Sequence, residues 1–179
     1  MMRNGKMSRT QKLTLCALFA ALTAVLSQVA VPLPMVPINM ALVAVYLAGG
    51  VLGARDGAMS QVVYVFMGAV GLPVFSLFRG GISILAGPTG GYIVGYILTA
   101  ALVGYLMEHW GGRFWQLVLS MVIGLALCYA LGTIWFVSIT HNTFVMALSV
   151  CVLPFLPGDA VKIALAAVLI PKIRAILWR

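Results

Sequence analysis

The sequence predicts an all-α membrane protein, a bundle of six transmembrane helices with both termini in the cytoplasm. The chain of 179 residues is 63% hydrophobic and only 8% charged, and its mean hydropathy of +1.13 lies outside the range of soluble globular proteins. Several apolar stretches approach the roughly 20 residues that a helix needs to cross a hydrocarbon core of about 30 Å. The chain does not alternate polar and apolar residues as a closed barrel would.

We expect the six helices to form a single domain, residues 1–179. Proline, glycine and charged residues separate the apolar stretches and place the helices at 13–31, 39–54, 57–71, 91–110, 115–139 and 158–177. GARDG (53–57) is predicted to be a tight charged turn. The irregular segment 71–91 is a candidate ligand loop, because non-helical backbone at membrane depth survives only against protein or water. Residues 143–155 are too few for a confident further span, and a seventh crossing would place the basic C-terminus outside.

The basic residues orient the predicted helices. Lys and Arg number 11 against three acids, which gives a net charge of +8. Four basic residues precede the first helix, Arg55 and Arg113 lie in predicted turns, and three follow residue 171, so nine of the eleven fall on the cytoplasmic side, as the positive-inside rule requires. We therefore expect a multi-pass protein of a prokaryotic plasma membrane, in contact with lipid and not with nucleic acid, whose residues 1–12 are a basic cytoplasmic segment.

Three charged residues remain on the outer side: Arg79, Asp159 and Lys162. A charge near the middle of a membrane costs at least about 2.5 to 3.5 kcal/mol on insertion scales. Each of these three residues is therefore a candidate functional residue. In PGDAVKIAL (157–165) the acid and the lysine stand one helical turn apart. We expect them to face a buried outer cavity, where Asp159 accepts a ligand N–H and Lys162 donates to an oxygen. The alternative is that Asp159 caps the last helix and forms a surface pair with Lys162.

The segment before the fourth helix supplies further binding candidates. Arg79 is followed by two glycines, which permit tight turns and close approach to a ligand, although a contact with solvent or a lipid headgroup is an equal alternative. GPTGGY (87–92) opens the helix, with Thr89 as the predicted N-cap and free amides that could meet a polar group; simple helix entry is the alternative. Tyr92 and Tyr96 could flank a ligand ring, but an interfacial aromatic belt is the favoured interpretation for them.

The sequence offers no apparatus for catalysis. Cys16, Cys128 and Cys151 lie singly in apolar runs, and His109 and His141 are predicted on opposite sides of the membrane, so neither a metal site nor a proton relay is indicated. GPTGGY lacks the GK[ST] ending of a phosphate loop. We therefore expect a protein that is not an enzyme and that holds no metal or cofactor.

Small residues in the first helix suggest a helix-packing surface. ALFAALTA spaces four alanines at helical intervals, and small residues allow close contact between membrane helices. This strip could pack inside the bundle, or it could dock a separate membrane subunit. Its members are Ala17, Ala20, Ala21 and Ala24.

Taken together, these segments resemble the BioY family, the biotin-specific substrate-binding (S) subunits of energy-coupling-factor (ECF) transporters. The resemblance covers about residues 13–176. It rests on GLPVF (71–75), GPTGGY (87–92) and PGDAVK (157–162), in this order within a hydrophobic frame. In the family, the Asp and Lys of the last helix and an Arg before the fourth helix resemble ligand contacts, which match Asp159, Lys162 and Arg79. The resemblance is weaker at Asn39, a further candidate contact, where relatives commonly carry Thr.

The resemblance implies biotin uptake. Such a subunit would bind biotin in an outward-facing pocket and deliver it across the membrane together with a transmembrane coupling subunit and two ATPase subunits. Biotin is then the transported ligand and not a cofactor. Two alternatives stay open from the residues alone. The same architecture could serve another water-soluble vitamin, or the chain could be a self-sufficient secondary transporter, which would need an intramembrane ion site and usually an internal repeat.

Overall fold

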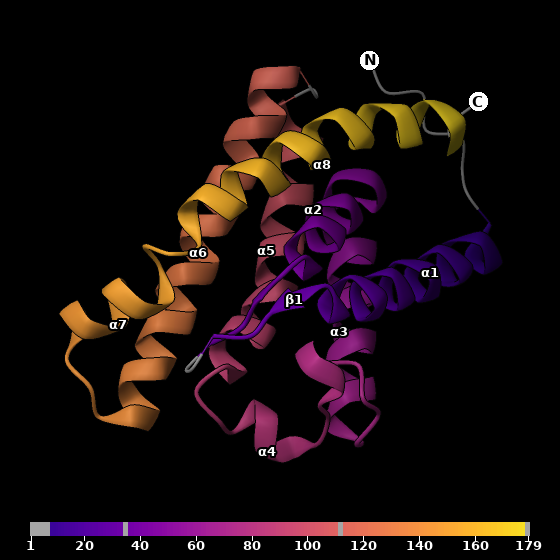
Figure 1. The fold of residues 1–179 in the computed structure, drawn as a ribbon. Helices are drawn as coiled ribbons and strands as arrows, with labels where there is room; N and C mark the ends of the chain where they lie inside the picture. The colour runs from indigo at the N-terminus through magenta and orange to yellow at the C-terminus, as the bar shows by residue number, and fades with distance from the viewer. Residues whose placement is uncertain (1–7, 34–35, 111–112, 178–179) are drawn as a thin grey trace.

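The computed structural model describes residues 8–33, 36–110 and 113–177, and its helices form one bundle (Figure 1). The first seven residues of the predicted basic segment, residues 34–35 of the proline-rich connection and Arg179 lie outside the described residues. The elements, in chain order, are α1 (Arg9–Gln28), β1 (Ala30–Val31), β2 (Ile38–Asn39), α2 (Ala41–Leu52), α3 (Ala54–Ala69), the 3-10 turn η1 (Ser76–Phe78), α4 (Ile82–Leu85), α5 (Gly90–Trp110), α6 (Phe114–Thr140), α7 (Phe144–Cys151) and α8 (Leu156–Leu177).

The six predicted helices correspond to α1, α2, α3, α5, α6 and α8. Within the described residues, α1, α5 and α6 are long and apolar enough to span a membrane, and α7 with α8 forms a fourth candidate, bent by 53°. The helices α2 and α3 have only 12 and 16 residues. The shorter of the two, α2, is tolerated because neighbouring helices surround it.

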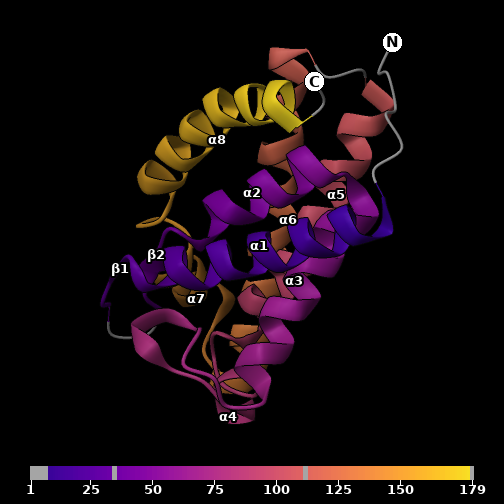
Figure 2. The same ribbon diagram turned by 90° about the vertical axis from the view of Figure 1, so that its right-hand side faces the viewer.

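Helix α2 forms the centre of the bundle. Eleven consecutive residues, from Ala41 to Val51, are buried, as expected for a helix that is apolar on every side. It packs against α1, α3, α5 and α8. In both ribbon views α2 lies among these helices, while the long pair α5 and α6 run side by side (Figures 1 and 2). Its N-terminal end therefore reaches the middle of the molecule, where the pocket described below begins.

Several helix ends differ from the predicted ones because local capping decides them. α1 begins at Arg9 and not at residue 13, since Ser8 and Gln11 form a reciprocal capping box. The predicted GARDG turn is wrong, because only Gly53 is non-helical there and Asp56 lies in the first turn of α3. Gly53 has a φ of +88°, which favours glycine. The short β1–β2 hairpin replaces the predicted start of the second helix at residue 39.

The residues predicted to lie in the cytoplasm come together at one end of the bundle. Lys12 of α1 pairs with Asp56 of α3 at 3.5 Å. Glu108, near the end of α5, accepts a hydrogen bond of 2.9 Å from the amide of Ala54 and so caps α3 from another helix. These contacts join three segments that the predicted topology puts on the same side of the membrane, whereas α4 lies at the opposite end of the molecule (Figure 1).

Candidate ligand-binding pocket

A pocket of about 130 Å³ opens between the β1–β2 hairpin, the loop that carries η1, and helices α2, α3, α4, α5, α6 and α8. One ordered water needs about 10–15 Å³ of such space. The pocket is therefore large enough for a small organic molecule. Aromatic and aliphatic side chains from these elements form much of its lining. All six residues that the sequence nominated for ligand binding line this pocket: Asn39, Arg79, Thr89, Tyr92, Asp159 and Lys162.

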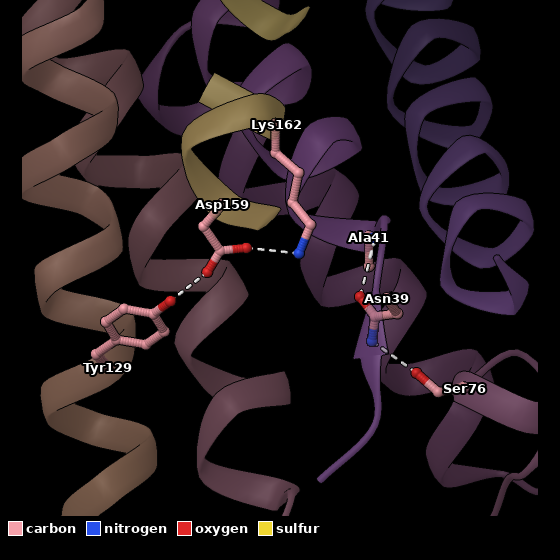
Figure 3. A network of polar contacts seen from close by, with 6 residues as sticks. All are labelled: Asn39, Ala41, Ser76, Tyr129, Asp159 and Lys162. Carbon is pink, nitrogen blue, oxygen red and sulfur yellow. Dashed lines mark hydrogen bonds and ion pairs between the residues drawn. The ribbon is translucent and has the colours of Figure 1, made fainter. Parts of the chain in front are cut away.

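The floor of the pocket holds a buried ion pair. Asp159 and Lys162, both in the first two turns of α8, are 0% and 2% exposed. Lys162 Nζ donates to Asp159 Oδ1 at 2.5 Å, and the Tyr129 hydroxyl from α6 donates to Oδ2 of the same carboxylate (Figure 3). The alternative of a surface pair is therefore wrong. Asp159 is not the N-cap either, because α8 begins three residues earlier, at Leu156.

Asn39 fixes one wall of the pocket. Its Oδ1 accepts from the amide of Ala41 at 2.9 Å, which satisfies a free donor at the start of α2. Its Nδ2 donates to Ser76 Oγ at 2.6 Å (Figure 3). The side chain thus ties the hairpin and the start of α2 to the loop that carries η1.

Arg79 lies at the exposed rim of the same pocket. A tight loop presents it, in which Phe75 and Arg79 exchange backbone hydrogen bonds and the intervening Leu77 and Phe78 have positive φ values of 63° and 56°. Gln28 of α1 holds this loop, since its amide donates to the carbonyls of residues 74 and 75 and accepts from the amide of Phe78. Among the described residues two ion pairs occur, and Arg79 belongs to neither.

The start of α5 contributes a polar residue and two aromatic rings. The carbonyl of Thr89 accepts from the amides of Tyr92 and Ile93, so Thr89 stands at the predicted N-cap position. Tyr92 and Tyr96 are 8% and 6% exposed and both line the pocket. The interfacial belt, which the sequence favoured for these two tyrosines, is therefore wrong.

Glycine lets the ring of Tyr92 pack close against α6. A Cβ at Gly132 would overlap the Tyr92 ring atoms, so helix and ring can approach closely only because that residue has no side chain. The Tyr92 hydroxyl then reaches Thr133 Oγ1 at 3.3 Å. This packing fixes the ring as a wall of the pocket.

Sequence reasoning missed Tyr129 and Ser76. Tyr129 lies in the middle of a 27-residue apolar helix, far from the membrane interfaces where tyrosine is usually found. A tyrosine at such a position needs a hydrogen-bond partner, and this requirement was the available signal. Ser76 carries no comparable signal in a loop of mixed composition.

The alanines of α1 divide between two environments. Ala20 is fully buried and Ala24 is half-buried, while Ala17 and Ala21 are exposed beside the exposed Leu18. The strip therefore runs along the border between the bundle interior and the exposed face of α1, and Ala20 packs inside the bundle. Only Ala17 and Ala21 lie fully on a face that a separate subunit could contact.

The comparisons with known proteins agree on one family. The model of the BioY family matches residues 1–179. The chain belongs to the BioY family. It is 37% identical over 164 residues to the biotin transporter BioY of Thermotoga maritima, which covers 92% of this chain and 96% of the relative. It is 36% identical to the probable biotin transporter BioY of Pyrococcus horikoshii, over 93% of this chain and 98% of the relative.

A solved structure shares the fold as well. The S-component for biotin from an ECF-type ABC transporter superposes with a TM-score of 0.88 at 25% identity, over 98% of this chain and 95% of that chain. The predicted six-helix S-component architecture is thereby confirmed. This BioY-family chain is a multi-pass membrane protein of a transporter family, and not an enzyme.

Proposed function

We propose that this chain captures biotin from outside the cell and is the substrate-binding subunit of an ATP-driven uptake system. Two relatives that match nearly its whole length are named biotin transporter and probable biotin transporter. The observation that carries the proposal is the ion pair of Asp159 and Lys162 at the floor of the pocket. Burying two charges costs several kcal/mol per ion, a cost best explained by a ligand that uses both.

The floor matches the ureido ring of biotin. That ring offers two N–H donors and one strong carbonyl acceptor. A carboxylate has about four acceptor sites and an ammonium has three donors, and Asp159 and Lys162 use only part of this capacity. Asp159 would accept from a ring N–H and Lys162 would donate to the ring carbonyl. Both hydrogen bonds are charge-assisted, and such bonds are the strong ones away from water.

The rest of the pocket matches the other parts of biotin. Tyr92 would cover the apolar thiophane ring, while Thr89 and Asn39 would supply polar contacts along the walls. The biotin carboxylate would lie at the rim beside Arg79, because the floor already holds a neutralised pair whose acid would repel a second carboxylate. The proposed orientation is therefore ring inward and carboxylate outward.

Delivery requires an energy source outside this chain. The structural relative is the S-component of an ECF-type ABC transporter, which supports an ECF module as the partner. We infer a module of one transmembrane coupling subunit and two ATPase subunits, with the termini of this chain in the cytoplasm.

The exposed face of α1 at Ala17 and Ala21 is the proposed docking surface for the coupling subunit. An Ala21→Leu variant should bind biotin normally but copurify with less of the module, because a larger side chain keeps the helices apart. Ala24→Ser, a small-for-small change next to it, is the control. Full copurification of the Ala21→Leu variant would place the docking surface elsewhere.

Calorimetric titration of the detergent-solubilised chain tests the ligand directly. The wild-type protein should bind biotin tightly and should not bind other water-soluble vitamins. Biotinamide lacks the carboxylate of biotin. It should bind less tightly than biotin, because it cannot form the contact proposed for Arg79. Lys162→Ala should weaken biotin binding by at least about 2 kcal/mol, the low end for truncating one member of a buried charged pair.

The matched control is Lys172→Ala, which removes an exposed lysine near the other end of α8. This variant should bind biotin as wild type does. Equal affinities for biotin in the Lys162→Ala and Lys172→Ala variants would rule out the assigned floor. If a different vitamin binds more tightly than biotin, that vitamin and not biotin is the ligand.

A further inference from the structure

The loop that carries Arg79 has a strained middle. Leu77 and Phe78 both adopt left-handed backbone conformations, with φ values of 63° and 56°. Such conformations are unfavourable for residues other than glycine, and they persist only where the surrounding structure holds them. The Phe78 side chain is 73% exposed, so packing of its ring contributes little to holding this part of the loop. Other contacts must therefore fix the backbone of the residue that comes directly before Arg79.

Helix α3 anchors the loop on either side of this strained middle. Phe75 is 2% exposed, and its ring packs edge-on against Tyr64 with 5.6 Å between the ring centroids. The same ring lies against Gly68, where an added Cβ would overlap it. After the strained residues, the amide of Gly81 donates to the carbonyl of Gly68 at 2.7 Å. These contacts hold residues 75 and 81, so the backbone between them needs a separate support.

Gln28, the last residue of α1, supplies that support. Its Oε1 accepts from the amide of Phe78 at 2.8 Å, and its Nε2 donates to the carbonyls of residues 74 and 75 at 3.1 and 3.2 Å. A carboxamide carries both an acceptor and donors, so this one side chain can join the two arms of the loop. The carbonyl of Phe75 also accepts from the amide of Arg79 at 3.2 Å. Gln28 therefore contacts the residue before Arg79 and the residue that pairs with Arg79 across the loop.

We propose that Gln28 is a positioning residue, which fixes this loop so that the Arg79 guanidinium can meet the carboxylate of the ligand. This role rests on the proposed function, in which the biotin carboxylate lies at the rim. Arg79 and Leu77 line the pocket, whereas Gln28 does not, so Gln28 acts on the ligand through the loop. A loop that is already fixed loses less conformational entropy when the ligand binds, and a guanidinium–carboxylate contact depends on geometry. Gln28 thereby sets how strongly the pocket prefers a ligand with a carboxylate.

Calorimetric titration with biotin and with biotinamide tests this role in Gln28→Met, a change that keeps the length of the side chain but removes the amide. The wild-type protein should bind biotin about tenfold more tightly than biotinamide, as expected for a hydrogen bond to a charged group. In Gln28→Met the affinity for biotin should fall to that for biotinamide, while the affinity for biotinamide stays close to wild type. The matched control is Gln11→Met, the same change near the other end of α1, and it should keep the wild-type preference for biotin.

A double-variant cycle shows whether Gln28 acts through Arg79. Arg79→Gln removes the guanidinium and should abolish the preference for biotin over biotinamide. Adding Gln28→Met to Arg79→Gln should cause no further loss of biotin affinity, because the effects of two residues that act through one contact are not additive. If the double variant loses as much again as Gln28→Met loses alone, Gln28 does not act through Arg79 and the inference is overturned.

The other outcomes separate the inference from the proposed function. A wild-type preference for biotin in Gln28→Met overturns the inference. So does a Gln28→Met chain that does not fold, or that loses affinity for both ligands by the same factor, because the amide would then serve the fold. Equal affinities of the wild-type protein for biotin and biotinamide overturn it as well, yet they leave biotin as the ligand. Failure of the wild-type protein to bind biotin would instead remove the proposed function, and the inference with it.

Discussion

Two ion pairs in different parts of the molecule use the same chemistry in different surroundings. Lys12 and Asp56 approach to 3.5 Å with side chains 49% and 23% exposed. Lys162 and Asp159 approach to 2.5 Å with side chains 3% and 1% exposed. The first pair joins α1 to α3 at the predicted cytoplasmic end, and the second lies within α8 at the pocket floor. Together they include two of the three acidic residues of the chain.

Both pairs consist of a lysine and an aspartate, so residue type does not distinguish them. Burial is what marks the Asp159–Lys162 pair as a candidate functional pair. An exposed pair contributes about 0–1 kcal/mol and is screened by salt. Burying a pair removes the favourable hydration of both charges. Their mutual attraction offsets this loss of free energy only when the geometry is very good. Lys12 and Asp56 therefore need no explanation beyond an exposed pair that joins two helices. Asp159 and Lys162 need the additional reason that a ligand provides.

The largest effect should come from breaking the buried pair on one side only. Lys162→Met leaves Asp159 buried without its cation, and we expect a loss of about 3–5 kcal/mol in the free energy of unfolding. The double variant Asp159→Asn with Lys162→Met should recover most of that stability, because no buried charge is left, but should not bind biotin. Thermal unfolding and calorimetry of the two proteins in the same detergent measure both quantities.

These two variants decide whether the pair serves binding or folding. If the double variant is as unstable as the single one, the pair stabilises the fold and its burial needs no ligand. If the double variant still binds biotin at wild-type affinity, the floor is not the site of ring recognition.

The smallest effect should come from the exposed pair. Asp56→Asn removes the partner of Lys12, and we expect a change of about 0–1 kcal/mol in the free energy of unfolding, together with unchanged affinity for biotin. Thermal unfolding at low and high salt is the measurement, since the difference from wild type should shrink as salt screens the wild-type pair. A loss as large as that of Lys162→Met would mean that exposure does not distinguish the two pairs.

The helices could be predicted because the length of an apolar run is a property of the chain itself. All six expected helices exist, from α1 to α8. Their ends were less predictable, because partners from elsewhere decide them. Glu108 caps α3 across 54 residues, which moves Asp56 from a predicted turn into a helix. Asn39 joined a hairpin and not a helix because Ala30 pairs with it.

The sequence predicted the charged residues of the pocket, because a buried charge is energetically unfavourable and therefore conspicuous. It did not predict the residues that are common in apolar helices. Asp159, Lys162 and Arg79 attracted notice because charges are rare in this chain, and all three line one pocket. Tyr129 passed unnoticed within an apolar helix. Its importance depends on what its hydroxyl reaches, and α6 brings it to Asp159 from 30 residues away in the chain.

The sequence by itself determined that this is a membrane bundle and which three charges require an explanation, because hydropathy and charge act residue by residue against lipid and water. Only the tertiary structure decided what lies beside those charges. It buried Asp159 and Lys162 beside Tyr129, and it left Arg79 at the rim and Ala21 on the outside. The physical reason is that burial and hydrogen-bond partners arise from packing between distant segments, which no single stretch of the chain contains.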